Sequence, residues 1–140
     1  MNKRGLLISF LVCKVGMALA AISLIGAALA MSSSFRRTAE RDELTTVADA
    51  LMQAIQTIDG IPGEVRLVRE LPAVEQQFWI NLTGTYDGTQ VAHLTIAGQN
   101  QVERVIMLRN KLNGGEFELS CDIPTFVRLT KINEVYLELV

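Results

Sequence analysis

Few side chains in this chain have the type and spacing that a catalytic or metal site requires. His93 is the only histidine, and no cysteine or histidine stands near it at metal-ligand spacing. No Gly-x-Ser-x-Gly, His-Glu-x-x-His or phosphate-binding glycine-rich sequence occurs. The glutamate pairs Glu116/Glu118 and Glu134/Glu138 fall at positions that a strand presents to solvent. We therefore expect no enzymatic activity, no cofactor and no metal site.

The two cysteines belong to different parts of the chain. Cys13 lies in an apolar run near the N-terminus, and Cys121 lies in the C-terminal half. Neither is part of a Cys-x-x-Cys or Cys/His cluster, so zinc and iron–sulfur sites have no support. We expect both to be small hydrophobic side chains, with an intermolecular disulfide through Cys121 as the alternative.

One modification sequence is present. Asn81-Leu82-Thr83 matches the acceptor sequence for N-glycosylation. Asn81 shares a strand face with Trp79, and that face could be solvated. Asn81 is therefore a candidate glycosylation site if this part of the chain is exported.

The strongest pattern lies in the first 31 residues. Lys3, Arg4 and Gly5 precede an apolar run of 26 residues, Leu6–Met31, whose only charge is Lys14. About 20 apolar helical residues cross the hydrocarbon core of a bilayer, so this run is long enough to span one. We expect a single-pass protein of the cell membrane with its distal domain outside the cell.

Three interpretations of this N-terminus are open. A secretory signal peptide would be cut after Ala28-Leu29-Ala30, which has the small-x-small pattern of such sites. An uncleaved anchor would keep the run as one span, and basic residues flank both of its ends, which leaves the orientation open. A very short basic leader would be cut directly after Gly5, and the apolar helix would stay on the mature protein.

The third interpretation is supported by a resemblance. Lys3-Arg4-Gly5-Leu6-Leu7 resembles the class III leader of archaeal type IV pilins and pilin-like proteins. The layout of the whole chain is similar too, with a short leader, an apolar helix, an amphipathic continuation and a β-rich domain. The resemblance implies that a prepilin peptidase recognises Arg4 and Gly5 and makes Leu6 the new N-terminus.

The same resemblance implies a role in assembly. Its partners would be the membrane, the prepilin peptidase, an assembly platform and other pilin-like subunits, in a homo- or hetero-oligomer. Phe10 stands where bacterial type IV pilins carry a glutamate, which favours a minor or accessory subunit over a major one.

An amphipathic helix is predicted beyond the apolar run. Apolar residues recur there at spacings of three and four: Leu44, Val47, Leu51, Ile55 and Ile58. No proline or glycine occurs between Gly26 and Gly60, so one helix is predicted from about Leu6 to Asp59. Gly60-Ile61-Pro62-Gly63 ends it, and its apolar stripe should pack against the domain that follows.

From Glu64 onward the hydrophobic period changes to two, which predicts strands. Asp87-Gly88 and Asn113-Gly114-Gly115 are turn sequences between alternating segments. Six or seven strands are expected, over residues 65–71, 78–83, 91–96, 102–108, 117–121, 126–131 and 135–140. Short antiparallel strands at this spacing predict a small sheet or sandwich.

The predicted fold class is therefore α+β. A leader (1–5), a membrane or filament-core helix (6–31) and an amphipathic helix (32–59) precede a β-rich extracellular domain (64–140). The segment from Thr38 to the C-terminus contains 8 Lys/Arg and 15 Asp/Glu, so its net charge is −7. This negative charge argues against nucleic-acid binding. The predicted function is a pilin-like subunit of a surface filament. The alternative is a membrane-anchored or secreted β-sandwich binding module with no filament role.

Overall fold

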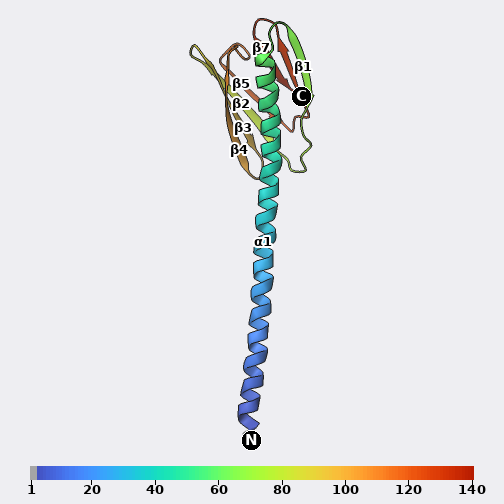
Figure 1. Cartoon of the computed structure of the whole chain (residues 1–140), viewed down its shortest axis with the longest axis vertical. Helices are drawn as coiled ribbons and strands as arrows, with labels where there is room; N and C mark the ends of the chain where they lie inside the picture. The colour runs from blue at the N-terminus through green and yellow to red at the C-terminus, as the bar shows by residue number, and fades with distance from the viewer. Residues whose placement is uncertain (1–2) are drawn as a thin grey trace. The chain divides into compact units, whose positions relative to one another are not determined.

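The computed structural model describes residues 3–140, with the side chains of residues 7–140, and has the predicted α+β architecture. One long helix, α1 (Lys3–Gly60), precedes the strands (Figure 1). The strands are β1 (Val65–Glu70), β2 (Trp79–Tyr86), β3 (Gln90–Ala97), β4 (Gln101–Leu108), β5 (Phe117–Asp122), β6 (Phe126–Lys131) and β7 (Val135–Leu139). The chain divides into two compact units, Met1–Thr38 and Ala39–Val140.

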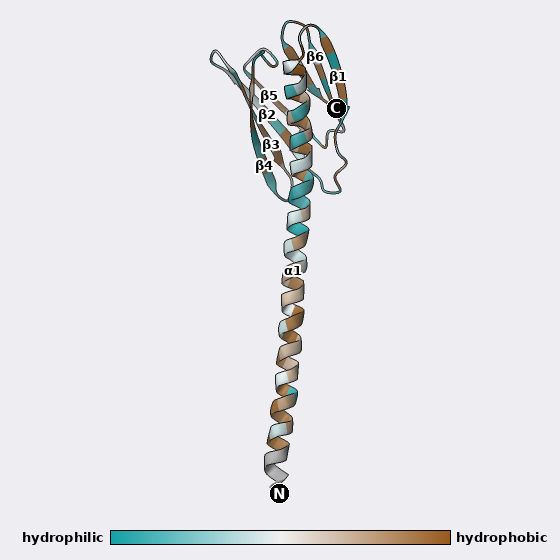
Figure 2. Ribbon diagram, viewed as in Figure 1, coloured by the Kyte–Doolittle hydropathy of each residue, from teal (hydrophilic) through white to brown (hydrophobic). Residues whose placement is uncertain are grey.

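The first unit consists of the N-terminal part of α1. Figure 2 shows that this part of the helix is mostly hydrophobic. Its large apolar side chains are exposed, for example Leu7 at 62%, Phe10 at 59% and Leu24 at 71%. By length and composition the helix can cross a membrane, and none of its most apolar window is buried by the described chain. The predicted membrane-compatible helix is confirmed.

The second unit contains two antiparallel sheets, with strand orders β1-β6-β7 and β4-β3-β2-β5. In the β2–β3 hairpin Tyr86 pairs with Gln90, and Gly88 has a φ of 73°. The turn predicted at Asp87-Gly88 is therefore confirmed, because a glycine adopts a positive φ without steric cost. The C-terminal segment is also a strand of a sheet, since β7 pairs with β6.

One hydrophobic core is enclosed by the second part of α1 and both sheets. The predicted apolar stripe of the helix is fully buried: Leu44, Val47, Ala48, Leu51, Ala54, Ile55 and Ile58 each have 0% exposure. These residues pack with alternate side chains of both sheets, including Leu94 on β3 and Leu129 on β6. The helix from Ala39 onward therefore belongs to the same compact unit as the strands.

A close contact between β2 and β5 depends on a glycine. Gly84 faces the core opposite Phe117, its register partner on β5. A Cβ at position 84 would lie 2.0 Å from Cε1 of the Phe117 ring. The aromatic ring therefore occupies the space that any side chain at position 84 would need.

Candidate functional site: the helix seat

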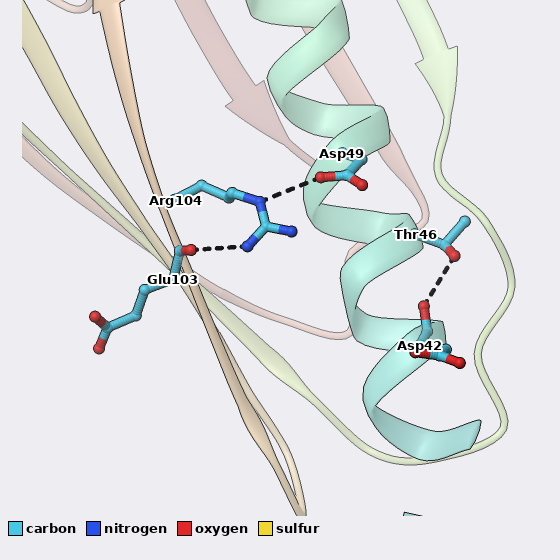
Figure 3. Close-up of polar contacts among 5 residues, drawn as sticks. All are labelled: Asp42, Thr46, Asp49, Glu103 and Arg104. Carbon is cyan, nitrogen blue, oxygen red and sulfur yellow. Dashed lines mark hydrogen bonds and ion pairs between the residues drawn. The ribbon is translucent and has the colours of Figure 1, made fainter. Parts of the chain in front are cut away.

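The most elaborate polar arrangement of the second unit holds α1 to the sheets, and we call these contacts the helix seat. Its first part is a pair of arginines on edge strands. Arg104 on β4 faces the helix, and its Nε lies 3.2 Å from Oδ1 of Asp49 (Figure 3). Arg69 on β1 donates a hydrogen bond of 3.2 Å from its guanidinium to Oε1 of Gln53.

These arginines also affect the sheet edges. β4 and β1 are the outer strands of their sheets. An inward-pointing charge on an edge strand disfavours the addition of a further strand from another chain. The Arg104–Asp49 pair is partly exposed, with 34% and 52% of the two side chains accessible. We therefore expect it to stabilise the fold by only about 0.2–1 kcal/mol.

The C-terminal end of α1 is held by Lys131, a buried lysine on β6 with 8% exposure. Its Nζ donates to the carbonyl oxygens of Ile58 (3.4 Å), Asp59 (2.9 Å) and Ile61 (2.7 Å). The last carbonyls of a helix have no intrahelical partner and carry the negative end of its dipole. The ammonium group therefore stabilises this helix end, and its three N–H donors all find acceptors.

Asp59 ties the same helix end to the segment after β4. Its carboxylate accepts hydrogen bonds from the backbone N–H of Arg109 (2.9 Å) and of Asn110 (3.0 Å). The side-chain amide of Asn110 donates a further bond of 2.8 Å. Burial raises the pKa of Asp59, but these hydrogen bonds and the charge of Lys131 outweigh it, so the net pKa lies below its ordinary value.

The other end of the seat involves the loop between β1 and β2. Nε2 of Gln76 donates a hydrogen bond of 2.6 Å to the carbonyl oxygen of Glu40. We call the part of α1 that belongs to the second unit, from Ala39 to Gly60, the seated helix. It is thus bonded to the rest of the unit near its first turn, along its length and at its last turn. These contacts hold the helix against both sheets at several points along its length.

Comparison with known protein families, curated proteins and solved structures finds no match. Function is therefore inferred from the residues and geometry of this chain.

The predicted processing residues lie at the edge of the described region. The backbone of Arg4, Gly5 and Leu6 is part of α1, and their side chains lie outside the described residues. Processing after Gly5 stays a prediction.

Asn81 lies on β2, a central strand of its sheet, between Thr95 on β3 and Ser120 on β5. Its Nδ2 donates a long bond of 3.4 Å to Oε1 of Glu118, and its buried Oδ1 has no hydrogen-bond partner among the described residues. The residue as a whole is half-buried, and the hydrogen bond of its Nδ2 lies at the exposed surface. Glycosylation of Asn81 stays a prediction.

His93 and the cysteines lie apart from the helix seat. His93 is exposed on β3, and no cluster of three or more potential metal ligands occurs among the described residues. Cys13 is exposed on α1, while Cys121 is half-buried on β5 with its Sγ 3.9 Å from the carbonyl oxygen of Leu139. Both are free thiols.

Sequence reasoning did not single out Arg104, Lys131 or Asp59. A signal was present for the first two, because each continues the inward-facing positions of its strand. Arg104 shares its face with Ile106, and Lys131 shares its face with Leu129. A charged residue at an inward-facing position needs a partner, and here the partners lie on α1 or directly after it. Asp59 had no comparable signal.

Proposed function

We propose that this protein is a pilin-like structural subunit, of the minor or accessory kind, in an archaeal type IV pilus-like surface filament. The observation that carries the proposal is that two parts of α1 differ in the exposure of their apolar side chains. Residues 7–31 expose their apolar side chains, whereas the stripe from Leu44 to Ile58 is buried against the sheets. A subunit held by one helix in a membrane, and later in a filament core, needs both properties.

The exposed apolar surface requires a partner of low polarity. Soluble proteins rarely expose contiguous apolar patches of more than a few hundred Å². Lipid would cover the segment before assembly, and the equivalent helices of other subunits would cover it in a filament. Hydrophobic burial between helices then supplies cohesion once the lipid is left behind.

The helix seat supports an assembly role as well. A platform that extracts the subunit pulls on the apolar segment, and the pull must reach the β-rich domain through the seated helix. Polar contacts at the first turn, at Asp49 and Gln53, and at the last turn distribute that pull over both sheets.

The test is N-terminal sequencing and intact mass of the protein from its native membrane. We compare the wild type with Gly5→Val, and use Gly16→Val as the matched control. A Cβ at Gly16 meets nothing within 4 Å. The wild type and Gly16→Val should start at Leu6, whereas Gly5→Val should keep Met1 and be missing from filaments sheared off the cell surface.

Two other results would overturn the proposal. A wild-type chain that starts at Met31 is a secreted β domain released from a signal peptide. A wild-type chain that keeps Met1 is a simple anchor, and the alternative function, a membrane-anchored binding module, is then favoured.

A further inference from the structure

Apolar side chains are exposed at the end of the second unit where the seated helix begins. The hydrogen bond from Gln76 to Glu40 fixes the loop before β2 beside the first turn of that helix. β2 starts there with Trp79, which is 41% exposed. Ile123 follows β5 and is 50% exposed. We call Trp79 and Ile123 the proximal surface.

Local contacts hold this surface together. The N–H of Ile123 donates to the carbonyl oxygen of Phe78, the residue before Trp79, at 3.0 Å. Trp79 and Ile123 line the same cleft, which has a volume of about 800 Å³. The indole and the isoleucine side chain are therefore presented by neighbouring, hydrogen-bonded segments.

The backbone at Ile123 is strained. Its φ is 45°, in the left-handed region that β-branched residues rarely adopt. Such a conformation is unfavourable for an isoleucine, and the following Pro124 restricts the residue further. The side chain is 50% exposed, so packing within this unit covers only about half of it. An apolar contact outside the chain would explain why an isoleucine occupies this position.

The distance along the chain identifies the nearest apolar environment. Ala39 follows Met31 by 8 residues. This stretch spans about 12 Å as a helix and at most about 28 Å fully extended. Whatever the orientation of the apolar segment, the start of the seated helix stays close to the surface of the membrane that holds it. Tryptophan is enriched at that depth, where its ring meets the headgroups.

The charges around the cleft indicate which headgroups suit this surface. Glu75 and Asp122 line the cleft together with Trp79. Strongly anionic lipid would be repelled by these carboxylates, whereas zwitterionic headgroups offer a choline cation to them.

We propose that the proximal surface docks into the headgroup interface of the bilayer that holds the apolar part of α1. This inference depends on the membrane anchoring within the proposed function, and it does not depend on leader processing or on filament assembly. Exposure alone would not distinguish this end, since Tyr86 at the other end of β2 is 39% exposed. Two features distinguish this end of the second unit. Only a few residues join it to the apolar run, and it carries the strained Ile123.

Trp79 is the only tryptophan, so its fluorescence reports on this surface alone. The full-length chain is reconstituted into phosphatidylcholine vesicles that contain a phosphatidylcholine with a nitroxide on its headgroup. Trp79 should lose most of its fluorescence relative to vesicles without the nitroxide. The matched control is Trp79→Phe/Tyr86→Trp, which moves the indole about 23 Å along β2 to a site of similar exposure. Its fluorescence should be retained.

Two variants of Ile123 test the contact itself. Ile123→Gly removes the side chain and accepts a positive φ, so the domain keeps its fold while the quenching of Trp79 falls. Ile123→Asp should reduce the quenching further. Circular dichroism of each variant verifies that the fold is intact.

Three results would contradict docking. In the first, Trp79 keeps its fluorescence beside the lipid nitroxide and is quenched by aqueous acrylamide. In the second, the indoles at positions 79 and 86 are quenched equally by the nitroxide. In the third result Trp79 is shielded from both quenchers only at high protein-to-lipid ratio, which would assign the surface to a second copy of the chain. Each can occur whether or not Gly5 is a processing site, so the two proposals fail separately.

Discussion

Lys131 and Asp59 both fix the last turn of α1. The ammonium of Lys131 binds the final carbonyl groups, and the carboxylate of Asp59 binds the backbone N–H groups after β4. Each group is ionised and hydrogen-bonded, which makes the bonds stronger than neutral ones. Removing Lys131 would leave buried and part-buried carbonyl groups without this donor, and removing Asp59 would leave the part-buried N–H of Asn110 without its acceptor, which costs more than the bond itself contributes.

Asp59→Asn should destabilise the protein at neutral pH by about 1–3 kcal/mol, because a carboxamide has one acceptor oxygen and its NH₂ would face a backbone donor. The pKa of Asp59 is lowered in the folded state from the ordinary 3.8. Its contribution to stability is therefore fully present above the ordinary pKa and is lost as the pH falls through the folded-state pKa. Urea unfolding of the detergent-solubilised chain at several pH values measures this.

The control for Asp59 is Asp42→Asn, which changes an exposed carboxylate on the same helix. It should shift the urea midpoint only slightly. The difference in stability between wild type and Asp59→Asn should shrink as the pH falls below about 4. A difference that stays constant down to acidic pH would show that the ionised carboxylate is not what stabilises this helix end.

At the scale of elements, local patterns predicted much of the fold. The spacing of Leu44, Val47 and Leu51 predicted the seated helix, and alternation predicted the strand ends to within three residues. Pairing could not be predicted in this way. Alternation fixes which side chains face the core, but not which strand lies beside which. β1 pairs with β6, and β2 with β5, across long stretches of sequence.

The helix seat was harder to predict for the same reason. Arg104 reaches Asp49 only because β4 forms the edge of its sheet beside α1, and that position depends on the pairing order. Lys131 likewise finds its acceptors only once β6 lies beside the helix end. A charge at an inward-facing position signals that a partner exists, but the partner's identity follows from the tertiary structure.

The contact between β2 and β5 yields a prediction at this scale. Gly84→Ala should destabilise the domain by about 1–3 kcal/mol, because the new methyl group overlaps the Phe117 ring and the ring must move. Phe117→Ala in the same chain should restore part of the loss, so the two changes are not additive. Thermal unfolding followed by circular dichroism measures both.

The matched control is Gly60→Ala, since a Cβ at Gly60 meets nothing within 4 Å and its φ is not positive. It should leave the unfolding midpoint nearly unchanged. If Gly84→Ala and Gly60→Ala behaved alike, the ring would not occupy the space above Gly84 as the structure has it.

At the scale of the whole molecule, the two units suit different surroundings. The first 37 residues contain 5 Lys/Arg and no acidic residue, whereas the remainder has a net charge of −7. Every buried apolar residue of the described chain lies at Leu44 or later. The first unit therefore adds nothing to the core of the second, and its apolar side chains need lipid or other helices instead.

Residues 39–140 should consequently fold without the apolar segment. We expect a soluble monomer that unfolds cooperatively in urea, because the core is complete and the net charge disfavours self-association. Residues 61–140 serve as the control, since they lack 7 of the 22 buried apolar residues of the described chain and should show no cooperative transition. Aggregation of residues 39–140, or equal behaviour of the two fragments, would mean that the second unit depends on the apolar helix for its own stability.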